Sequence, residues 1–515
     1  MLLRGRITIA AGLCVLGALL WTALAGVGTE AAAEPRPSGA LPEVGAFNPD
    51  SVETPELEVD PVEPVLPSPV PTTPPPATEA PAEAPVEVPA AEPVVDAPSK
   101  KGRKVPPELL ARIPVPLPNG GSASVPRLVA GGDAAALSTS RSERVVERLL
   151  LAAERGGTAT PVRVEYTLDA ELTESIYDIF ERGRVELGLA VVLDPATGKV
   201  LAYAGTNPKR LPPSEVYPAA SLVKVVTAAT ALATVPGVAG RGCRFVGNPY
   251  RLTPARVVPP RRGTEITLER AIAMSNNQCF AQIAVNDLGA KRLLDAFDRF
   301  GLLRAPGPGH ESGQAADPHG DRFALGKLGC GLAGLQITAL HAAEIAATLV
   351  DGKRRAPRWI ERVTDAKGQA LELPPTPAPE TVLSPALAKQ LREMMIETTL
   401  TGTARRAFHA VYGRPILREM SVAAKTGSLS GTTPPGRYEW FIGLAPADRP
   451  KVAIAVLVVQ QKRWHTTGSQ VGAQILNAIF CSGGVCRADR ANQWLAAELA
   501  SPKAAPAATR GAVEE

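Results

Sequence analysis

"YPAASLVKVVTAATAL", residues 217–232, is an apolar run in which Ser221 and Lys224 stand three positions apart. A lysine in such surroundings is costly to bury unless it is paired or neutral. A single S-x-x-K is expected by chance in a chain of 515 residues, and alone it is most simply a lysine whose ammonium reaches solvent from an amphipathic helix. The rest of the sequence therefore has to decide what this pair does.

Two further short motifs follow in order along the chain. Ser275-x-Asn277 interrupts a run of helical sequence, and Lys425-Thr426-Gly427 lies in a strand-like run. Alone, S-x-N usually caps a helix and K-T-G usually forms a turn. Together the three motifs occupy a helix start, a break between helices and a strand, which chance does not readily supply. The sequence therefore predicts one site built from all three.

The residue types in this constellation suit nucleophilic catalysis. Ser221 at a helix N-terminus lies in a positive local field that stabilises an alkoxide or a developing oxyanion. Lys224 lies on the same helix face and can reach the serine hydroxyl. A lysine is a base only when neutral, and burial beside a second cation, Lys425, lowers its pKa. Ser275 can relay a proton to a leaving amine, and Asn277 can hold Lys224 and a substrate amide.

The strand motif suits a peptide substrate. Lys425 and Thr426 supply a charge and a hydroxyl for a substrate carboxylate. Gly427 allows a peptide to approach the strand edge and add to the sheet.

The sequence predicts no metal and no cofactor. The nucleophilic chemistry described above needs neither, and the five histidines form no H-x-x-x-H or H-E-x-x-H pattern.

Hydrophobic patterning places strands at both ends of the folded region and helices between them. "GLAVVLDPATGKVLAYAG" predicts two strands around a turn at residues 195–198, and "MSVAAKTGSLS", "EWFIGLAPA" and "KVAIAVLVVQ" predict three more. The first and last strands are expected to be neighbours in an antiparallel sheet. Helices are predicted near residues 140–154, over "LQITALHAAEIAATLVDG" with a stop at Gly352, and over "SPALAKQLREMMIETTL" with Ser384 as cap.

The three motifs in this order resemble those of the penicillin-binding transpeptidases, the serine acyltransferases of cell-wall synthesis. The resemblance covers roughly residues 162–492 and includes "VVLDPATGKVLAYAG", "LGAKRLLDAFDRFGL", "GCGLAGLQITALHAAEIAATLVDGK", "LREMMIETTLTGTARRA" and "WFIGLAPADRPKVAIAVLV". It implies an α/β (α+β) fold, with an antiparallel sheet flanked by helices plus an all-helical subdomain.

The resemblance also implies an activity. Ser221 would be acylated by a peptidoglycan stem peptide ending in D-Ala-D-Ala, with release of the last D-Ala. An amine of a neighbouring stem would then attack. The backbone N–H groups of Ser221 and Ser428 would form the oxyanion hole, and β-lactams would be inhibitors. Cell-wall synthesis proteins are the partners that this family implies.

Several alternatives stay open or are set aside at this stage. A D,D-carboxypeptidase would use the same residues with water as acceptor. Retention of all three motifs argues against a non-catalytic penicillin-recognising sensor or scaffold, although a sensor can retain acylation. A β-lactamase is disfavoured, because the E-x-x-L-N loop of one large class is missing between Asn277 and Lys425. "GSLSG" matches the hydrolase nucleophile elbow at Ser430, but the prolines that follow prevent the helix that this elbow requires.

The chain is divided by composition into five parts. Residues 1–30 carry Arg4 and Arg6 before an apolar run long enough to span a bilayer, which predicts a membrane anchor or, alternatively, a cleaved signal. Residues 31–100 are a proline-rich linker, residues 101–160 a short extension, residues 161–492 the transpeptidase domain and residues 493–515 a tail. The extension is too short for a glycosyltransferase domain, and a pedestal domain looks absent or reduced. The catalytic domain is therefore expected outside the cytoplasm, in the periplasm or its equivalent.

Charge and cysteine content agree with an exported protein. The net charge of +4 without a basic and aromatic run gives no support for nucleic-acid binding. Five cysteines follow the leader, so at least one is unpaired. Cys481 with Cys486 could close a small loop, and Cys243 with Cys279 a larger one; Cys330 would then remain.

Overall fold

The computed structural model describes residues 104–115, 144–151, 160–409, 417, 420–461, 465–493 and 495. The predicted leader, the proline-rich linker and nearly all of the predicted C-terminal tail lie outside these residues. Within the described part, no helix is both long and apolar enough to cross a bilayer.

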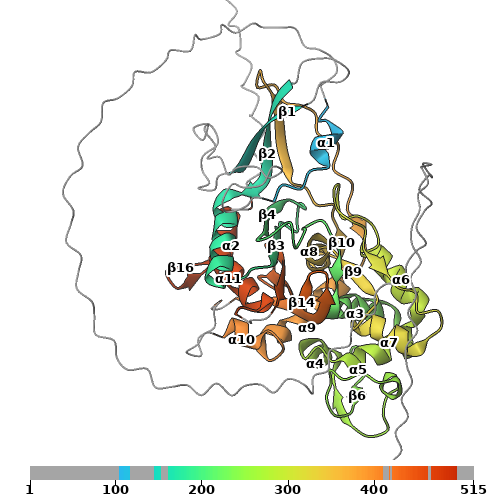
Figure 1. Cartoon of the computed structure of the whole chain (residues 1–515). Helices are drawn as coiled ribbons and strands as arrows, with labels where there is room; N and C mark the ends of the chain where they lie inside the picture. The colour runs from blue at the N-terminus through green and yellow to red at the C-terminus, as the bar shows by residue number, and fades with distance from the viewer. Residues whose placement is uncertain are drawn as a thin grey trace, which may run out of the picture. The chain divides into compact units, whose positions relative to one another are not determined.

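A five-stranded antiparallel sheet forms the centre of the molecule (Figure 1). Its strands lie in the order β13(Ala423–Thr432), β14(Pro435–Ala445), β15(Val452–Gln460), β3(Gly188–Leu193) and β4(Val200–Gly205). The predicted adjacency of early and late strands is confirmed, because β15 pairs with β3 with Ile454 opposite Val192. Among the described residues, β13 pairs with β14 alone and is therefore an edge strand.

The sheet is buried on both faces, and its side chains alternate between two cores. On β15, Ile454 and Val456 pack into one core, whereas Ala455 and Leu457 pack into the other. Helices α2(Ala170–Arg182) and α11(Gly468–Phe480) supply apolar residues to the first core, and α8(Ala339–Thr348) supplies them to the second. Burial on both faces explains why these strands read as continuous apolar runs in the sequence.

A helical region lies beside the sheet, at the end of the drawing away from β1 and β2 (Figure 1). Within the described residues it is made of α3(Val223–Thr234), α4(Leu268–Ala273), α5(Asn277–Gln282), the π-helix η5(Ile283–Leu288), α6(Gly289–Arg299) and α7(Arg322–Cys330), with the hairpin β6(Cys243–Phe245)–β7(Thr264–Ile266). The break predicted between helices at the second motif is confirmed. Helix α9(Pro385–Leu400) packs on β13. Ser384 caps this helix as predicted, because its Oγ accepts a hydrogen bond from the N–H of Leu387.

Two sequence predictions of local structure were wrong. The helix expected near residues 140–154 is a strand, β1(Arg144–Leu151), which pairs with β2(Thr160–Asp169) in a sheet completed by β11(Ile360–Asp365). The helix expected from residue 335 begins only at Ala339, because β9(Leu335–Ile337) first pairs with β5(Tyr217–Pro218). In both cases pairing with a distant strand overrides the local helical pattern.

The described part of the N-terminal extension packs on the same body. It includes α1(Pro107–Leu110), and Val105, Leu109 and Val115 are buried in the core. The remaining short elements are β8(Gln314–Ala315), β10(Lys353–Arg354), β12(Glu380–Thr381), α10(Arg405–Phe408), β16(Cys481–Ser482), β17(Val485–Cys486), η3(Ala220–Leu222), η4(Pro254–Val257) and η6(Ala488–Gln493).

Candidate active site

Ser221 stands in a tight turn between β5 and α3. The turn is the 3₁₀ helix η3, and its residue Ala220 has a left-handed backbone (φ 48°), a conformation that costs a non-glycine residue free energy. Two neighbours hold it in place. The indole of Trp440 donates to Pro218 O at 2.8 Å, and Gly331 lies so close beneath that any Cβ there would overlap the Ala220 carbonyl.

Lys224 is completely buried and makes three short polar contacts. Its Nζ lies 2.7 Å from Ser221 Oγ, 2.7 Å from Asn277 Oδ1 and 2.6 Å from Cys330 O. A neutral amine has two N–H donors and one lone pair. The amide and carbonyl oxygens can take the two donors, which leaves the lone pair for the hydroxyl proton of Ser221. The three contacts therefore suit both charge states: an ammonium donates to all three oxygens, whereas a neutral amine donates to two and accepts the serine proton.

The second motif occupies the connection between α4 and α5. Ser275 has a left-handed backbone (φ 57°), and Asn277 is the first residue of α5. The side-chain N–H of Asn277 donates to Tyr250 O at 2.7 Å, and its backbone N–H donates to Pro249 O at 2.9 Å. These bonds turn Asn277 Oδ1 toward Lys224.

Lys425 on β13 is also completely buried. Its Nζ donates to Ser275 Oγ at 2.8 Å and to Thr426 O at 2.7 Å. Because the ammonium of Lys425 is enclosed, it would not contact a bound carboxylate directly. It would stabilise the carboxylate electrostatically, and Thr426 would supply the hydrogen bond. Thr426 itself is half-buried and shares a hydrogen bond of 2.6 Å with Thr403.

Gly427 brings the edge strand against the nucleophile turn. A Cβ at this position would lie 3.2 Å from both the backbone nitrogen of Ser221 and the Cβ of Ala220. The missing side chain therefore lets β13 and the serine backbone approach each other closely. Ser428 follows on the strand, where its Oγ accepts a hydrogen bond from Arg437 Nε at 2.7 Å.

Burial sets the acidity of both lysines. Loss of hydration lowers the pKa of Lys224 to about 8, a change partly opposed by the Cys330 thiol. The pKa of Lys425 is lowered well below its usual range, first by burial and then by the neighbouring Lys224 ammonium. Two ammonium groups in one enclosed site repel each other, so the site favours at least one neutral amine near neutral pH.

The structure brings together the predicted groups by direct contact: Ser221, Lys224 and Asn277 on one side, Ser275 with Lys425 on the other, and Gly427 against the serine. Ser430 is not a nucleophile elbow, because β13 continues past it and no helix follows. Reasoning from the sequence missed the carbonyl groups of Cys330 and Tyr250, the Thr403 hydroxyl and Arg437. The backbone carbonyls carry no sequence signal, whereas Thr403 lies in the quoted segment "LREMMIETTLTGTARRA".

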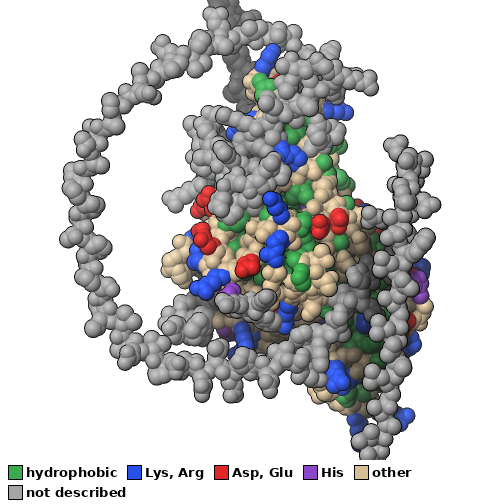
Figure 2. Space-filling model, viewed as in Figure 1, with side chains coloured by type: hydrophobic (Ala, Val, Ile, Leu, Met, Phe, Trp, Pro, Cys, Tyr) green, Lys and Arg blue, Asp and Glu red, His purple; other side chains and the backbone are tan. Residues whose placement is uncertain are grey.

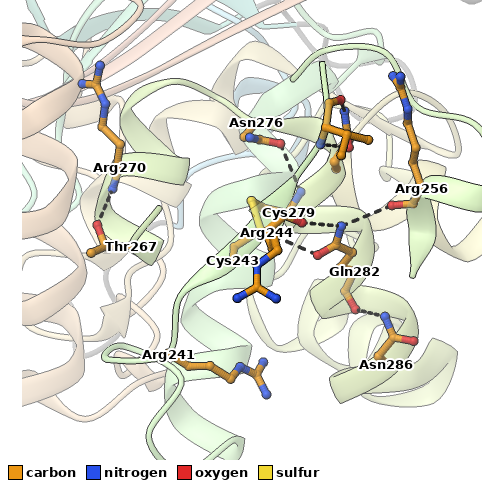
Figure 3. The surroundings of a disulfide bond; sticks show 12 residues. Arg241, Cys243, Arg244, Arg256, Thr267, Arg270, Asn276, Cys279, Gln282 and Asn286 are labelled. Atoms are coloured by element: carbon orange, nitrogen blue, oxygen red, sulfur yellow. Dashed lines mark hydrogen bonds between the residues drawn. A yellow bond between two sulfur atoms is a disulfide. The ribbon is translucent and has the colours of Figure 1, made fainter. Parts of the chain in front are cut away.

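A disulfide lies just behind the second motif (Figure 3). Cys279, in the first turn of α5, is joined to Cys243 of β6. The second pairing considered, Cys481 with Cys486, also forms, and Cys330 is a buried free thiol. In the part of the chain that the structure describes, no group of three or more His, Cys, Asp or Glu residues could hold a metal.

We expect the disulfide between Cys243 and Cys279 to contribute strongly to stability. It closes a loop across 36 residues, for which chain entropy predicts about 4 kcal/mol. The paired substitution Cys243→Ser and Cys279→Ser should lower the free energy of unfolding by about that amount in urea titration. The matched control is Cys481→Ser with Cys486→Ser, which opens a loop of only 5 residues and should cost about 2 kcal/mol. Equal losses in the two variants would contradict the expectation.

Comparison with known proteins finds similarity to penicillin-binding transpeptidases, in agreement with the motifs of the site. The family model described as penicillin binding protein transpeptidase domain matches residues 188–481, more than half of the chain. The chain is 28% identical over 371 residues to the peptidoglycan D,D-transpeptidase PbpA of Mycobacterium tuberculosis, covering 63% of this chain and 72% of that protein. It is 26% identical over 375 residues to the peptidoglycan D,D-transpeptidase FtsI of Escherichia coli, covering 67% of this chain and 59% of that protein.

A solved structure with similar architecture is penicillin-binding protein A from Mycobacterium tuberculosis in its imipenem acyl-enzyme complex. Its TM-score to this chain is 0.51 at 26% identity, and the match covers 61% of this chain and 79% of that one.

Proposed function

The chain belongs to the penicillin-binding protein transpeptidase family, and we infer that it is a peptidoglycan D,D-transpeptidase that acts through an acyl-enzyme on Ser221. The observation that carries this inference is the contact of 2.7 Å between Ser221 Oγ and the buried Lys224 Nζ. When the amine is neutral, Asn277 Oδ1 and Cys330 O can accept its two N–H donors, which leaves its lone pair for the hydroxyl of Ser221.

Acylation follows from these positions. Neutral Lys224 takes the hydroxyl proton of Ser221 as Oγ attacks the carbonyl carbon of the penultimate D-Ala. The N–H groups of Ser221 and Ser428 would donate to the developing oxyanion. When the tetrahedral intermediate collapses, the C–N bond breaks, and the proton that Lys224 accepted is relayed through the hydroxyl of Ser275 to the leaving D-Ala amine. Ser275 is held by Lys425, and Lys224 is neutral again after the relay. The product is an ester on Ser221 and free D-Ala.

Transfer reverses these roles. An amine from a neighbouring stem attacks the ester carbonyl, loses its proton to the site and forms the cross-linking amide, and Ser221 leaves with its proton restored. Water in place of the amine would give carboxypeptidase activity, which is the second candidate. The edge position of β13 supports peptide binding, since an added strand can pair with its open side.

Inhibition and location follow from the same chemistry. A β-lactam offers Ser221 a strained cyclic amide. When its C–N bond breaks, the amine stays tethered to the acyl group, so it does not leave the site and make room for the acceptor. The imipenem acyl-enzyme of a similar protein supports this inference.

The catalytic domain then lies outside the cytoplasm, where peptidoglycan is cross-linked. We propose that residues 1–30 anchor it in the membrane, that residues 31–100 are a spacer and that residues 161–492 form the transpeptidase domain.

Product analysis tests the proposed activity. The full chain is incubated with uncross-linked peptidoglycan, the glycan is digested, and the muropeptides are separated by mass. We expect cross-linked dimers and released D-Ala, and a fluorescent penicillin should label the wild-type chain covalently. Trimmed tetrapeptides without dimers would make the protein a carboxypeptidase, and absence of labelling would favour a scaffold.

Acylation should depend on pH through Lys224. The neutral amine is the active form, and its pKa is lowered to about 8. The rate constant for penicillin acylation should therefore rise about tenfold per unit well below pH 8 and level off above it. Stopped-time labelling across pH 6 to 9.5, with thermal unfolding measured at each pH, checks this expectation. A rate that is flat over the range in which the protein stays folded would contradict a neutral-lysine base.

A further inference from the structure

Positive charge is concentrated in one segment beside the active site. Residues 241–270 contain seven arginines and two glutamates, whereas the whole chain has a net charge of only +4. The excess in these thirty residues is therefore larger than that of the entire chain. Figure 2 shows blue side chains around the lower end of the molecule, where Figure 1 places β6.

The segment is fixed to the helices rather than loosely attached. Gln278 donates to Val246 O and Asn248 O at 2.9 and 2.8 Å, and it accepts from Val246 N–H. Gln282 donates to Arg244 O and Arg256 O (Figure 3). Asn286 donates to Val257 O. With the disulfide, these amides hold the backbone along α5 and η5. A surface held in this way loses little conformational entropy when a ligand binds.

Only part of the positive charge is neutralised within the chain. Arg241 pairs with Asp287, and Arg244 pairs with Glu265. Arg261 and Arg262, by contrast, are adjacent and exposed, and no carboxylate among the described residues lies within ion-pair distance of either. These two side chains supply exposed positive charge that a ligand would meet.

The segment also reaches the catalytic cleft. Tyr250 O binds the Asn277 side chain, and the Tyr250 side chain is 45% exposed. Arg270 donates to Thr401 Oγ1 at 2.5 Å. Burial raises the pKa of Tyr250, and the charge of Arg270 partly opposes this rise. The segment therefore contacts the motif that holds Lys224 through Tyr250, and it also carries the exposed Arg261 and Arg262.

We propose that residues 241–270 form a docking surface for the carboxylates of uncross-linked peptidoglycan stem peptides. The inference rests on the proposed function and deepens it. Each uncross-linked stem ends in a carboxylate, and a glycan strand presents many of them. Guanidinium groups bind carboxylates well, and several weak contacts on one polymer add through effective concentration. The surface would thus bring a strand to the cleft and keep it there between turnovers.

The test measures how much of the full chain sediments with peptidoglycan sacculi. Phosphate-containing polymers are first removed from the sacculi, so that carboxylates are the acidic groups that remain. We expect Arg261→Gln with Arg262→Gln to weaken binding about threefold to tenfold at physiological salt, and added salt to reduce this difference. Sacculi whose carboxylates are converted to amides should bind wild type and variant equally weakly. The matched control is Arg182→Gln with Arg184→Gln, which removes two exposed arginines at the end of α2 and should leave binding unchanged.

Penicillin labelling distinguishes failure of the docking surface from failure of the proposed catalytic function. The variant in Arg261 and Arg262 should be labelled at the wild-type rate, since neither residue touches the catalytic groups. Wild-type binding by the variant, or an equal loss in the α2 control, would overturn the docking surface. So would arginine-dependent binding that survives amidation of the sacculi, or a preference for vesicles of anionic phospholipid. Failure of the proposed function would appear instead as absence of labelling in every variant.

Discussion

Replacing Ser221 with alanine should abolish covalent labelling by a fluorescent penicillin and reduce cross-linking to background. In the proposed mechanism the ester forms on Ser221 Oγ, which alanine lacks. Nucleophile removal in serine hydrolases leaves a rate lower by about 10⁶. Gel fluorescence and intact mass, which gains the mass of the penicillin in the wild type only, measure the loss.

Ser430→Ala is the matched control for this variant. It removes a serine hydroxyl from the same cleft edge, in the G-x-S-x-G match, and it should keep wild-type labelling. Thermal unfolding of the Ser221 variant should stay close to that of the wild type, because Lys224 retains Asn277 Oδ1 and Cys330 O as acceptors. Labelling that persists in Ser221→Ala and disappears in Ser430→Ala would show that Ser430 is the nucleophile, and it would contradict the site proposed around Ser221.

The site could be predicted from the sequence as far as side chains carry its chemistry. Ser221, Lys224 and Asn277 are specific residue types at specific spacings, so their meeting could be expected before any fold was known. The third ligand of Lys224 is the carbonyl of Cys330, which any residue could provide. Only the packing of the end of α7 beneath the nucleophile turn reveals it. The supports of Asn277 from Pro249 and Tyr250 carbonyls were hidden for the same reason.

The same distinction applies to the fold. Strands β14 and β15 are buried on both faces, so their apolar runs identify them without knowledge of their partners. Strand β1 has no such signature, and its state depends on pairing with β2 across residues 152–159. Local sequence cannot include that pairing energy, which explains the wrong prediction of a helix there. The short strand β9 delays the start of α8 by the same mechanism.

Replacing Lys224 with methionine should lower the acylation rate by about 10³, the size of a general-base contribution. Methionine fills a similar volume, so the cavity is small. Asn277 Oδ1 and Cys330 O would each lose a donor, at about 1–3 kcal/mol apiece. Removal of a fully buried amine that must lose its hydration offsets part of this loss. We therefore expect a modest fall in thermal stability and a large fall in labelling rate, measured on the same preparation.

Two further variants separate a base from a mere positive charge. Lys224→Arg keeps a cation whose pKa lies above about 12, so it cannot accept the Ser221 proton at neutral pH. If the lysine acts as a base, this variant should be as slow as Lys224→Met; acylation within tenfold of wild type would contradict the base and favour an electrostatic role. Lys224→Ala leaves a polar cavity between Ser221 Oγ and Asn277 Oδ1 that a small amine can enter. Added methylamine should then restore labelling in proportion to its neutral fraction, whereas guanidine, which stays charged, should not.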